Sequence, residues 1–343
     1  MEADRAAMQL KSFAEKHCRG QSPLYDYLCS SMAEDDRLVE IVRTAPEGQP
    51  APNLILAAVH YLLLGGVQHE LAQYYATCAE APLPAEKSYS VFREFCLEHE
   101  EEIRELLATR RVQTNEVRRC ANLLPAFSII SQLQPDRSLA IIEVGTSAGL
   151  LLNWDRYAYN FGTGTRYGDP DAPVQIQSEW RRSPPPLSAK TPPIVIDRVG
   201  IDLHVVDVND EQESRWLRSL VWPDQPARMK LIAAAIQQFR WTPASLLEGD
   251  AFDLLPAAIE SLSTESVVCV FHCHTLNQFS ADRRQDFAAL LSECSKQRPM
   301  NQLSAEWILT LQPELRWIQW EDGHPAETLL ANVDHHGRWI EWS

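Results

Sequence analysis

The feature that most constrains the fold is an apolar segment that runs into a glycine-rich turn and then a helical pattern. Residues 139–144 read Leu-Ala-Ile-Ile-Glu-Val, Gly145 and Gly149 follow with Ser147 between them, and leucines 150–152 begin the helical pattern. Glycine lets a backbone pass close to a ligand, and the first N–H groups of a helix point at the same place. The segment therefore predicts the opening of a nucleotide-binding α/β unit.

Three more strands are expected downstream, each ending in polar residues. Asp202 ends the apolar approach 199–201, Asp250 follows residues 245–249, and His272 ends the uninterrupted apolar run 266–271. Such runs are typical of buried parallel strands, whose carboxyl ends carry ligands in open α/β sheets. Asp207 is a second candidate for the acidic position after the second strand.

At residues 143–149 the chain resembles the glycine-rich first motif of class I S-adenosylmethionine-dependent methyltransferases. The resemblance implies that Glu143, Gly145 and Gly149 surround the methionine part of the cofactor. In this sequence Ser147 places a hydroxyl in the same turn, so we expect it at the cofactor site as well. The segment 143–149 lacks the G-x-G-x-x-G spacing that is typical of dinucleotide-binding folds. A tight turn before an ordinary α/β helix remains an alternative.

The same resemblance assigns the next two acids. Asp202 would accept hydrogen bonds from the ribose hydroxyls, a task for which a carboxylate is suited. Asp250, with the small residue Ala251 behind it, would read the adenine amino group. Either acid could instead be an ordinary residue of a strand end or loop.

His272 and His274 are the candidate catalytic residues, because imidazole titrates near neutrality and can assist a nucleophile that loses a proton. His272 lies at the end of the predicted strand and His274 at its exit, and at most one of the two is expected to face the pocket. The other could cap the strand. A metal site that adds His335 and His336 has unfavourable spacing, so we predict no bound metal. Cys273 is a weak candidate nucleophile.

Longer phrases resemble a bacterial family catalogued as a domain of unknown function, over most of the chain. The phrases are residues 119–126, 143–149 with 154–157, 200–202, 215–218, 221–225 with Arg228, and 336–342. The family's fold is understood as methyltransferase-like and no substrate is established, so the resemblance supports architecture more than activity.

Two domains are expected. Residues 1–134 show helical periodicity, with a buried helix at 53–64 that ends at Gly65 and a helix capped by Thr114. Residues 135–343 form the second domain, a Rossmann-like, methyltransferase-type α/β sheet with helices on both faces. Residues 160–193 are rich in Gly and Pro and predict an inserted hairpin or lid. No helix separates 306–311 from 315–320, which predicts a C-terminal β meander.

Charge excludes several partners. The 343 residues include 31 Lys and Arg against 47 Asp and Glu, for a net charge of −16, and both predicted domains are acidic. A nucleic-acid partner or a polybasic membrane anchor is therefore not expected.

The apolar run 54–64 is too short to span a bilayer. Early acids at Glu2 and Asp4 do not fit a signal peptide. Eight scattered cysteines without a C-x-x-C pair favour reduced thiols in the cytoplasm.

These observations favour an S-adenosylmethionine-dependent methyltransferase that acts on a small-molecule or protein nucleophile, with the helical domain as a cap. One alternative is a non-catalytic module that keeps the fold, binds S-adenosylmethionine or a protein partner, and performs no chemistry. A weaker alternative is a metal-dependent hydrolase that uses His272 and His274.

Overall fold

The computed structural model describes residues 2–182, 190–308 and 310–343. The chain divides into two compact units. The helical unit comprises Met1–Thr114 and Val208–Ala233, and the sheet unit comprises Asn115–Asp207 and Ala234–Ser343. The sequence predicted a single boundary after residue 134, which stays a prediction. By compactness, residues 115–134 group with the sheet and residues 208–233 with the helices, a long-range association that local periodicity does not reveal.

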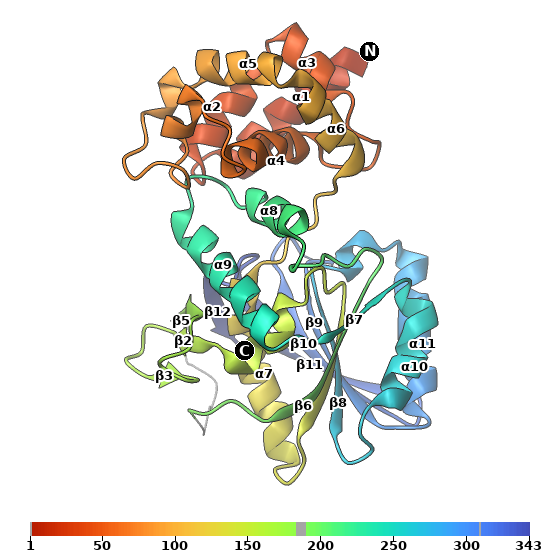
Figure 1. Cartoon of the computed structure of the whole chain (residues 1–343). Helices are drawn as coiled ribbons and strands as arrows, with labels where there is room; N and C mark the ends of the chain where they lie inside the picture. The colour runs from red at the N-terminus through yellow and green to blue at the C-terminus, as the bar shows by residue number, and fades with distance from the viewer. Residues whose placement is uncertain (1, 183–189, 309) are drawn as a thin grey trace. The chain divides into compact units, whose positions relative to one another are not determined.

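The helical unit consists of helices, and no strand occurs among its described residues (Figure 1). Its helices are α1 (Glu2–Phe13), the π-helix η1 (Ala14–Cys18), α2 (Pro23–Met32), α3 (Asp36–Val42), α4 (Ala51–Leu64), the 3-10 helices η2 (Glu70–Tyr74) and η3 (Ala85–Lys87), α5 (Tyr89–Glu98), α6 (Glu100–Thr109) and α8 (Glu211–Ser219). Side chains of Ser22, Asp35 and Asp210 cap α2, α3 and α8 by accepting backbone N–H groups. The division between the units falls within α9 (Pro226–Trp241).

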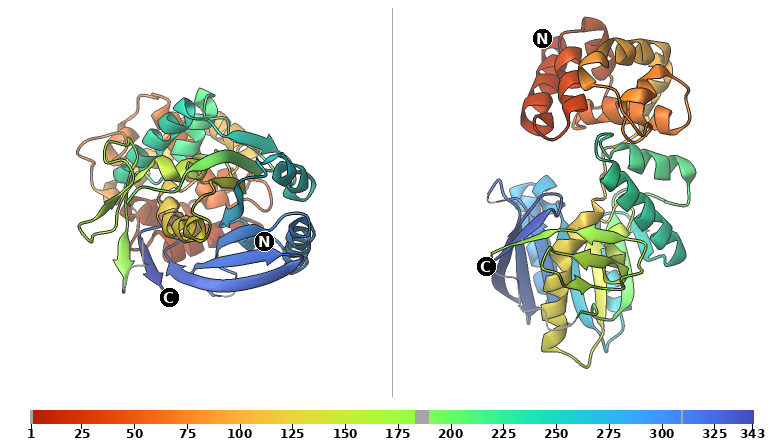
Figure 2. Two further views of the ribbon diagram at one scale, coloured as in Figure 1. Left: turned by 90° about the horizontal axis from the view of Figure 1, so that it is seen from below. Right: turned by 90° about the vertical axis from the view of Figure 1, so that its left-hand side faces the viewer.

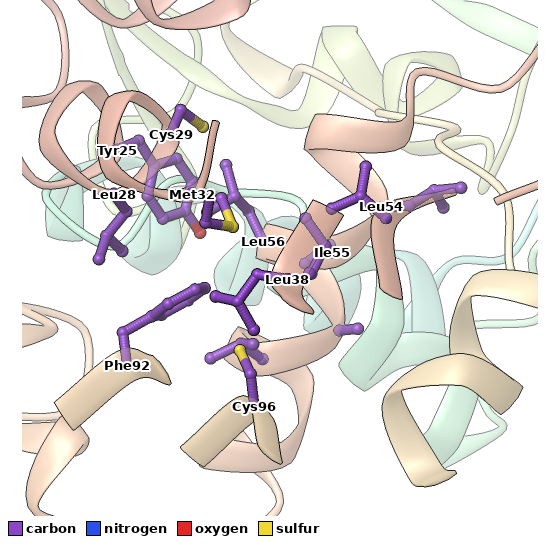
Figure 3. Close-up of a cluster of buried hydrophobic side chains, with 14 of the residues drawn as sticks. Tyr25, Leu28, Cys29, Met32, Leu38, Leu54, Ile55, Leu56, Phe92 and Cys96 are labelled. Atoms are coloured by element: carbon purple, nitrogen blue, oxygen red, sulfur yellow. The ribbon is translucent and has the colours of Figure 1, made fainter. Parts of the chain in front are cut away.

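Helix α4 lies at the centre of the core of this unit. Nearly every one of its side chains is buried, and α2, α3 and α5 contribute apolar side chains around it (Figure 3). A helix that is apolar on all sides is expected to be buried on all sides. The predicted buried helix at 53–64 is confirmed as α4, with Gly65 at its C-terminal end.

His60 is the one strongly polar side chain in the middle of α4, and it is fully buried. Its Nδ1 lies 3.0 Å from the carbonyl oxygen of Ser219, and its Nε2 lies 2.7 Å from the hydroxyl of Thr77. The carbonyl can only accept, so Nδ1 carries the proton and Nε2 accepts from Thr77. Burial lowers the pKa of His60 to about 4.

The pH dependence of stability should therefore carry a contribution from His60. The ordinary pKa of about 6.5 applies to the unfolded chain, so between pH 6.5 and pH 4 the unfolded state binds more protons. The contribution of neutral His60 to the free energy of unfolding is fully present above pH 6.5 and is lost as the pH falls from 6.5 towards 4. Between pH 7.5 and pH 5 we expect a loss of about 2 kcal/mol in the free energy of urea unfolding.

His60→Asn keeps a donor for Ser219 but does not titrate, so the loss between these two pH values should be about 2 kcal/mol smaller in this variant. His324→Asn, at an exposed position, should keep the wild-type dependence. Equal pH dependence in wild type and His60→Asn would contradict the assignment.

The sheet unit is built on a nine-stranded sheet in the order β5-β12-β11-β10-β9-β8-β1-β6-β7. The strands are β1 (Leu139–Val144), β5 (Glu179–Arg181), β6 (Val195–Asp202), β7 (Ser245–Glu248), β8 (Val267–Cys273), β9 (Met300–Glu306), β10 (Glu314–Glu321), β11 (His324–Val333) and β12 (Trp339–Trp342). The five strands from β7 to β9 are parallel, and β10, β11 and β12 are antiparallel to their predecessors. The mixed α/β class with a large, mostly parallel sheet is confirmed.

Helices cover both faces of the parallel part (Figures 1 and 2). Helices α10 (Ala251–Ser261) and α11 (Ala281–Ser295) pack on the face that carries Val268 and Val270 of β8. On the other face Phe271 meets Phe127 of α7 (Cys120–Leu133) at 5.5 Å between ring centroids. Because successive β8 side chains alternate between covered faces, every one of them is buried, as the apolar run predicted.

Three local predictions are refined by the structure. The 3-10 helix η4 (Val117–Arg119) immediately precedes α7, and its cap is Glu116 rather than the predicted Thr114. The pattern after Gly149 forms the 3-10 helix η5 (Leu150–Arg156). The insertion contains a small sheet of β2 (Ala158–Asn160), β3 (Arg166–Tyr167) and β4 (Gln175–Gln177), and its residues 183–189 lie outside the described residues. The predicted C-terminal meander corresponds to strands β9 through β12. One further short element, the 3-10 helix η6 (Leu276–Gln278), precedes α11.

Candidate functional site

The candidate site lies at the edge of the sheet where β1, β6, β8 and β9 end. These strands are parallel, and β11 runs the same way as β9 because it is two antiparallel steps away. Their carboxyl ends therefore share one edge. The strand order reverses at β1, since β6 and β7 extend to one side and β8 and β9 to the other. Ligands of open α/β sheets bind at such a point.

The loops after β1 and β8 touch each other at this point. The hydroxyl of Thr275 donates to the carbonyl oxygen of Val144 at 3.1 Å. A Cβ added to Gly145 would lie 2.2 Å from that hydroxyl oxygen, and Gly145 has φ +79°. Glycine is therefore required here by the protein's own packing as well as by backbone conformation.

The backbone of the glycine turn alternates in hand, with φ of +79° at Gly145, +53° at Ser147 and +72° at Gly149. The N–H of Ser147 donates to Asp202 Oδ2 at 2.8 Å, and the N–H of Leu150 donates to Asn115 Oδ1 at 3.0 Å. A non-glycine residue in the left-handed region stores strain, which natural proteins concentrate at functional sites. The structure thus brings Gly145, Ser147, Gly149 and Asp202 together.

Asp202 retains capacity for a ligand. Its carboxylate accepts from Ser147 and, through Oδ1, from the N–H of His204 at 3.0 Å. A carboxylate has about four acceptor positions, so about two remain, and the residue is only partly buried. The rival Asp207 is exposed.

Glu143 faces inward. Its side chain is 1% exposed and accepts a hydrogen bond from the hydroxyl of Thr146 at 2.8 Å. Burial raises the pKa of Glu143 well above its usual range. Glu143 therefore holds Thr146 of the glycine turn from inside the core. Its direct contact with a cofactor stays a prediction.

Asp250 has structural partners for both carboxylate oxygens. Oδ1 caps α10 by accepting from the N–H of Phe252 at 3.0 Å, and Oδ2 pairs with Arg283. Ala251 is buried as the first residue of α10. A helix cap explains an acid at this position without a ligand, so the adenine-reading role of Asp250 and Ala251 also stays a prediction.

His272 has partners inside the core at both ring nitrogens, and a catalytic role for this residue stays a prediction. The ring is fully buried, with Nδ1 2.8 Å from Glu306 Oε1 and Nε2 3.0 Å from the side-chain nitrogen of Gln302. Its position in β8 turns it towards α11, where it meets Phe287 edge-to-face at 5.9 Å. Both ring nitrogens are therefore committed inside the core.

Glu306, at the end of β9, was not identified from the sequence, although an acid that ends a mostly buried strand is an unusual feature. Its Oε1 accepts the N–H groups of Thr275 and Leu276 at 2.9 and 3.1 Å, and its Oε2 accepts that of Asn277 at 3.2 Å. With the His272 ring, four donors converge on one buried carboxylate. This cluster fixes the loop after β8.

Glu306→Ala should destabilise the chain by about 3–5 kcal/mol in urea unfolding, because it leaves several buried donors without an acceptor. Amide exchange at residues 275–277 should accelerate. Glu306→Gln, which keeps one acceptor oxygen, should lie between Ala and wild type. Glu321→Ala, at an exposed position, should stay within about 0.5 kcal/mol of wild type. A Glu306→Ala variant as stable as Glu321→Ala would show that the cluster does not hold the loop.

His274 lies at the start of the same loop with φ +59°. Neither ring nitrogen has a hydrogen-bond partner among the described residues, whereas the ring meets that of His335 edge-to-face at 5.3 Å. Burial, reinforced by the nearby Arg119 guanidinium, lowers the pKa of His274 to about 2. An imidazole with so low a pKa is uncharged and weakly basic at neutral pH, so it suits hydrogen bonding better than proton removal.

The turn that carries His335 is held by residues that sequence reasoning did not assign. Asp334 accepts the backbone N–H groups of His336 and Arg338 and pairs with the Arg338 side chain. Arg119 Nε donates to the carbonyl oxygen of His335 at 2.9 Å. The signal was present, since 119–126 and 336–342 were among the phrases shared with the bacterial family.

Gly145→Ala should test the contact between the two loops. Gly162 has the same φ of +79° but no neighbour within 4 Å of an added Cβ, so Gly162→Ala measures backbone strain alone. We expect Gly145→Ala to cost at least about 2 kcal/mol more than Gly162→Ala in urea unfolding. Adding Thr275→Ala to Gly145→Ala should recover part of that loss. Equal losses for the two alanine variants would contradict the contact.

The described residues contain no group of three or more His, Cys, Asp and Glu side chains arranged to hold a metal ion. None of the helices they form is both long and apolar enough to cross a bilayer.

Comparison with known families gives one match. A family model described as an uncharacterized protein conserved in bacteria (DUF2332) matches residues 7–342, which is nearly the whole chain. No curated protein matches the sequence.

Proposed function

We propose that this chain, which belongs to the bacterial family DUF2332, binds S-adenosylmethionine where β1 and β6 end and is a methyltransferase for a small-molecule or protein nucleophile. The observation that carries the proposal is the meeting of the strained glycine turn with Asp202 where the strand order reverses. In chain order the five parallel strands lie as 3-2-1-4-5, the arrangement of Rossmann-like nucleotide-binding sheets. This order supports the finer, Rossmann-like fold assignment, and the role of the helical unit as a cap domain stays a prediction.

The residues at the edge fit the cofactor at its ribose. Asp202 would accept the two hydroxyls of a ribose with the acceptor positions that Ser147 and His204 leave. Gly145, Ser147 and Gly149 would border the methionine part, with Glu143 supporting the turn from inside the core. Asp250 and Ala251 are assigned the adenine end by the resemblance alone.

When bound, S-adenosylmethionine supplies an electrophilic methyl group. The chain's own residues would orient and desolvate the reactants, which is most of what such a transfer requires. Asp202 would fix the ribose, the loop held by Glu306 would exclude water, and His274 would hydrogen-bond the acceptor. The acidic chain also suits a cationic sulfonium better than a polyanion. Eight free thiols favour a reducing compartment, and we propose the cytoplasm.

Calorimetric titration with S-adenosylmethionine and with S-adenosylhomocysteine tests the proposal directly. Wild type should bind both. Asp202→Asn keeps an oxygen for Ser147 but loses the charge, so it should weaken binding by about tenfold or more. The exposed Asp207→Asn is the matched control and should bind as wild type does, and His274→Ala should also bind normally. No measurable heat from a folded sample at millimolar ligand would overturn the proposal.

A non-catalytic module that keeps the fold is the second candidate, and a specific observation favours it. The oxygens of Asp250 are already engaged, and the low pKa of His274 makes it a poor base. Such a module would bind the cofactor or a protein partner without turnover. If bound S-adenosylmethionine loses its methyl group in the presence of an acceptor, the chain is a methyltransferase and not a non-catalytic module. No observation favours the metal-dependent hydrolase.

A further inference from the structure

We propose that three aromatic rings, Trp307, His335 and His274, form the acceptor side of the site, and that this ring site takes an uncharged aromatic molecule. The ring site is defined by these three residues. As an acceptor site it rests on the proposed methyltransferase function, whereas the binding of an aromatic ring there does not.

The three rings form a continuous series. Trp307 meets His335 edge-to-face at 5.7 Å, and His335 meets His274 edge-to-face at 5.3 Å. They come from three different segments, which follow β9, β11 and β8, and these strands end at one edge of the sheet. Aromatic rings favour edge-to-face contact at these distances, so a further ring can join the series in the same way.

The series runs from exposed to buried. Trp307 is 39% exposed, a large fraction for a tryptophan, and its neighbour Ile308 is 37% exposed. His274 at the other end is partly buried, and no hydrogen bond occupies its ring nitrogens among the described residues. A molecule with an aromatic body and one polar atom matches this order, with the ring against Trp307 and the polar atom at His274.

The rings offer no charge to a ligand. Burial lowers the pKa of both His274 and His335. The nearby charged groups have partners of their own, since Arg119 donates to the His335 carbonyl and Asp334 pairs with Arg338. A cationic ligand would lose hydration and meet the Arg119 guanidinium, and an anionic one would lose hydration next to a guanidinium that already donates to the His335 carbonyl. The lone pair of an uncharged acceptor would form the bond to the methyl carbon while the carbon–sulfur bond breaks and its electron pair stays on sulfur, giving S-adenosylhomocysteine. The product's extra proton would then leave to water, so no base is needed.

Three probes that share a benzene ring test the class: aniline, which is uncharged at pH 7.5, benzoate and benzylamine. Ligand-detected NMR with the intact chain should give saturable binding for aniline and weaker binding for the other two. Trp307→Ala should weaken aniline binding by about fivefold or more. Trp241→Ala is the matched control, since Trp241 is the more exposed tryptophan at 63% and lies in the same unit. That variant should bind as wild type does.

His335→Asn should also weaken aniline binding and should leave the heat of S-adenosylhomocysteine binding unchanged. Stronger binding of benzoate or benzylamine than of aniline would overturn the uncharged class. Unchanged aniline binding in Trp307→Ala would overturn the ring site. Aniline binding without any cofactor binding would instead refute the methyltransferase proposal and leave the ring site standing, so the two failures are distinguishable.

Discussion

One buried carboxylate positions the edge of the sheet on which the candidate site is built. Glu306 accepts three consecutive backbone N–H groups and contacts the ring of His272, so the loop after β8 has a single well-defined course. That course puts the Thr275 side chain against the carbonyl of Val144 and into the space that a Cβ at residue 145 would fill. The loop that Glu306 holds therefore adds a steric requirement for glycine to the one that the φ of residue 145 already imposes, across 161 positions of the sequence.

The parts of the fold that depend on local pattern could be predicted from the sequence. Uninterrupted apolar runs predicted β1 and β8, because a strand that is buried on both faces needs such a run. Shorter apolar stretches that lead to an acid predicted β6 and β7, and all four strands occur in the expected order. The glycine turn was recognisable because positive φ at residues 145 and 149 demands glycine. The family was recognised from shared phrases, which the match over residues 7–342 confirms.

The parts that depend on pairing between distant segments could not be predicted. His272 and His274 are two residues apart, so alternation along a strand does not tell them apart. Glu306 and Gln302 on the neighbouring strand hold the His272 ring in the core, whereas His274 follows the end of β8 with φ +59°. Asp250 reads equally well as an adenine ligand and as a helix cap, and only the position of Phe252 and Arg283 reveals the cap. Asn115 accepts a hydrogen bond from the N–H of Leu150, a contact across 35 positions that joins the segment before α7 to the sheet unit and that the sequence does not show.

The electrostatics of the edge separate the task of holding a cofactor from the task of activating an acceptor. On one side Asp202 presents a partly exposed carboxylate next to a strained turn, which suits a ribose and a nearby cation. On the other side burial and Arg119 hold the pKa of His274 at about 2, so this imidazole does not remove a proton at neutral pH. If the proposed methyl transfer takes place at this edge, an acceptor that is already nucleophilic when it binds suits the site best. Selectivity would then rest on which uncharged molecules fit the ring site. A chain of this kind with no such acceptor in its cell would bind the cofactor and release it unchanged, which is the physical difference between the two candidate functions.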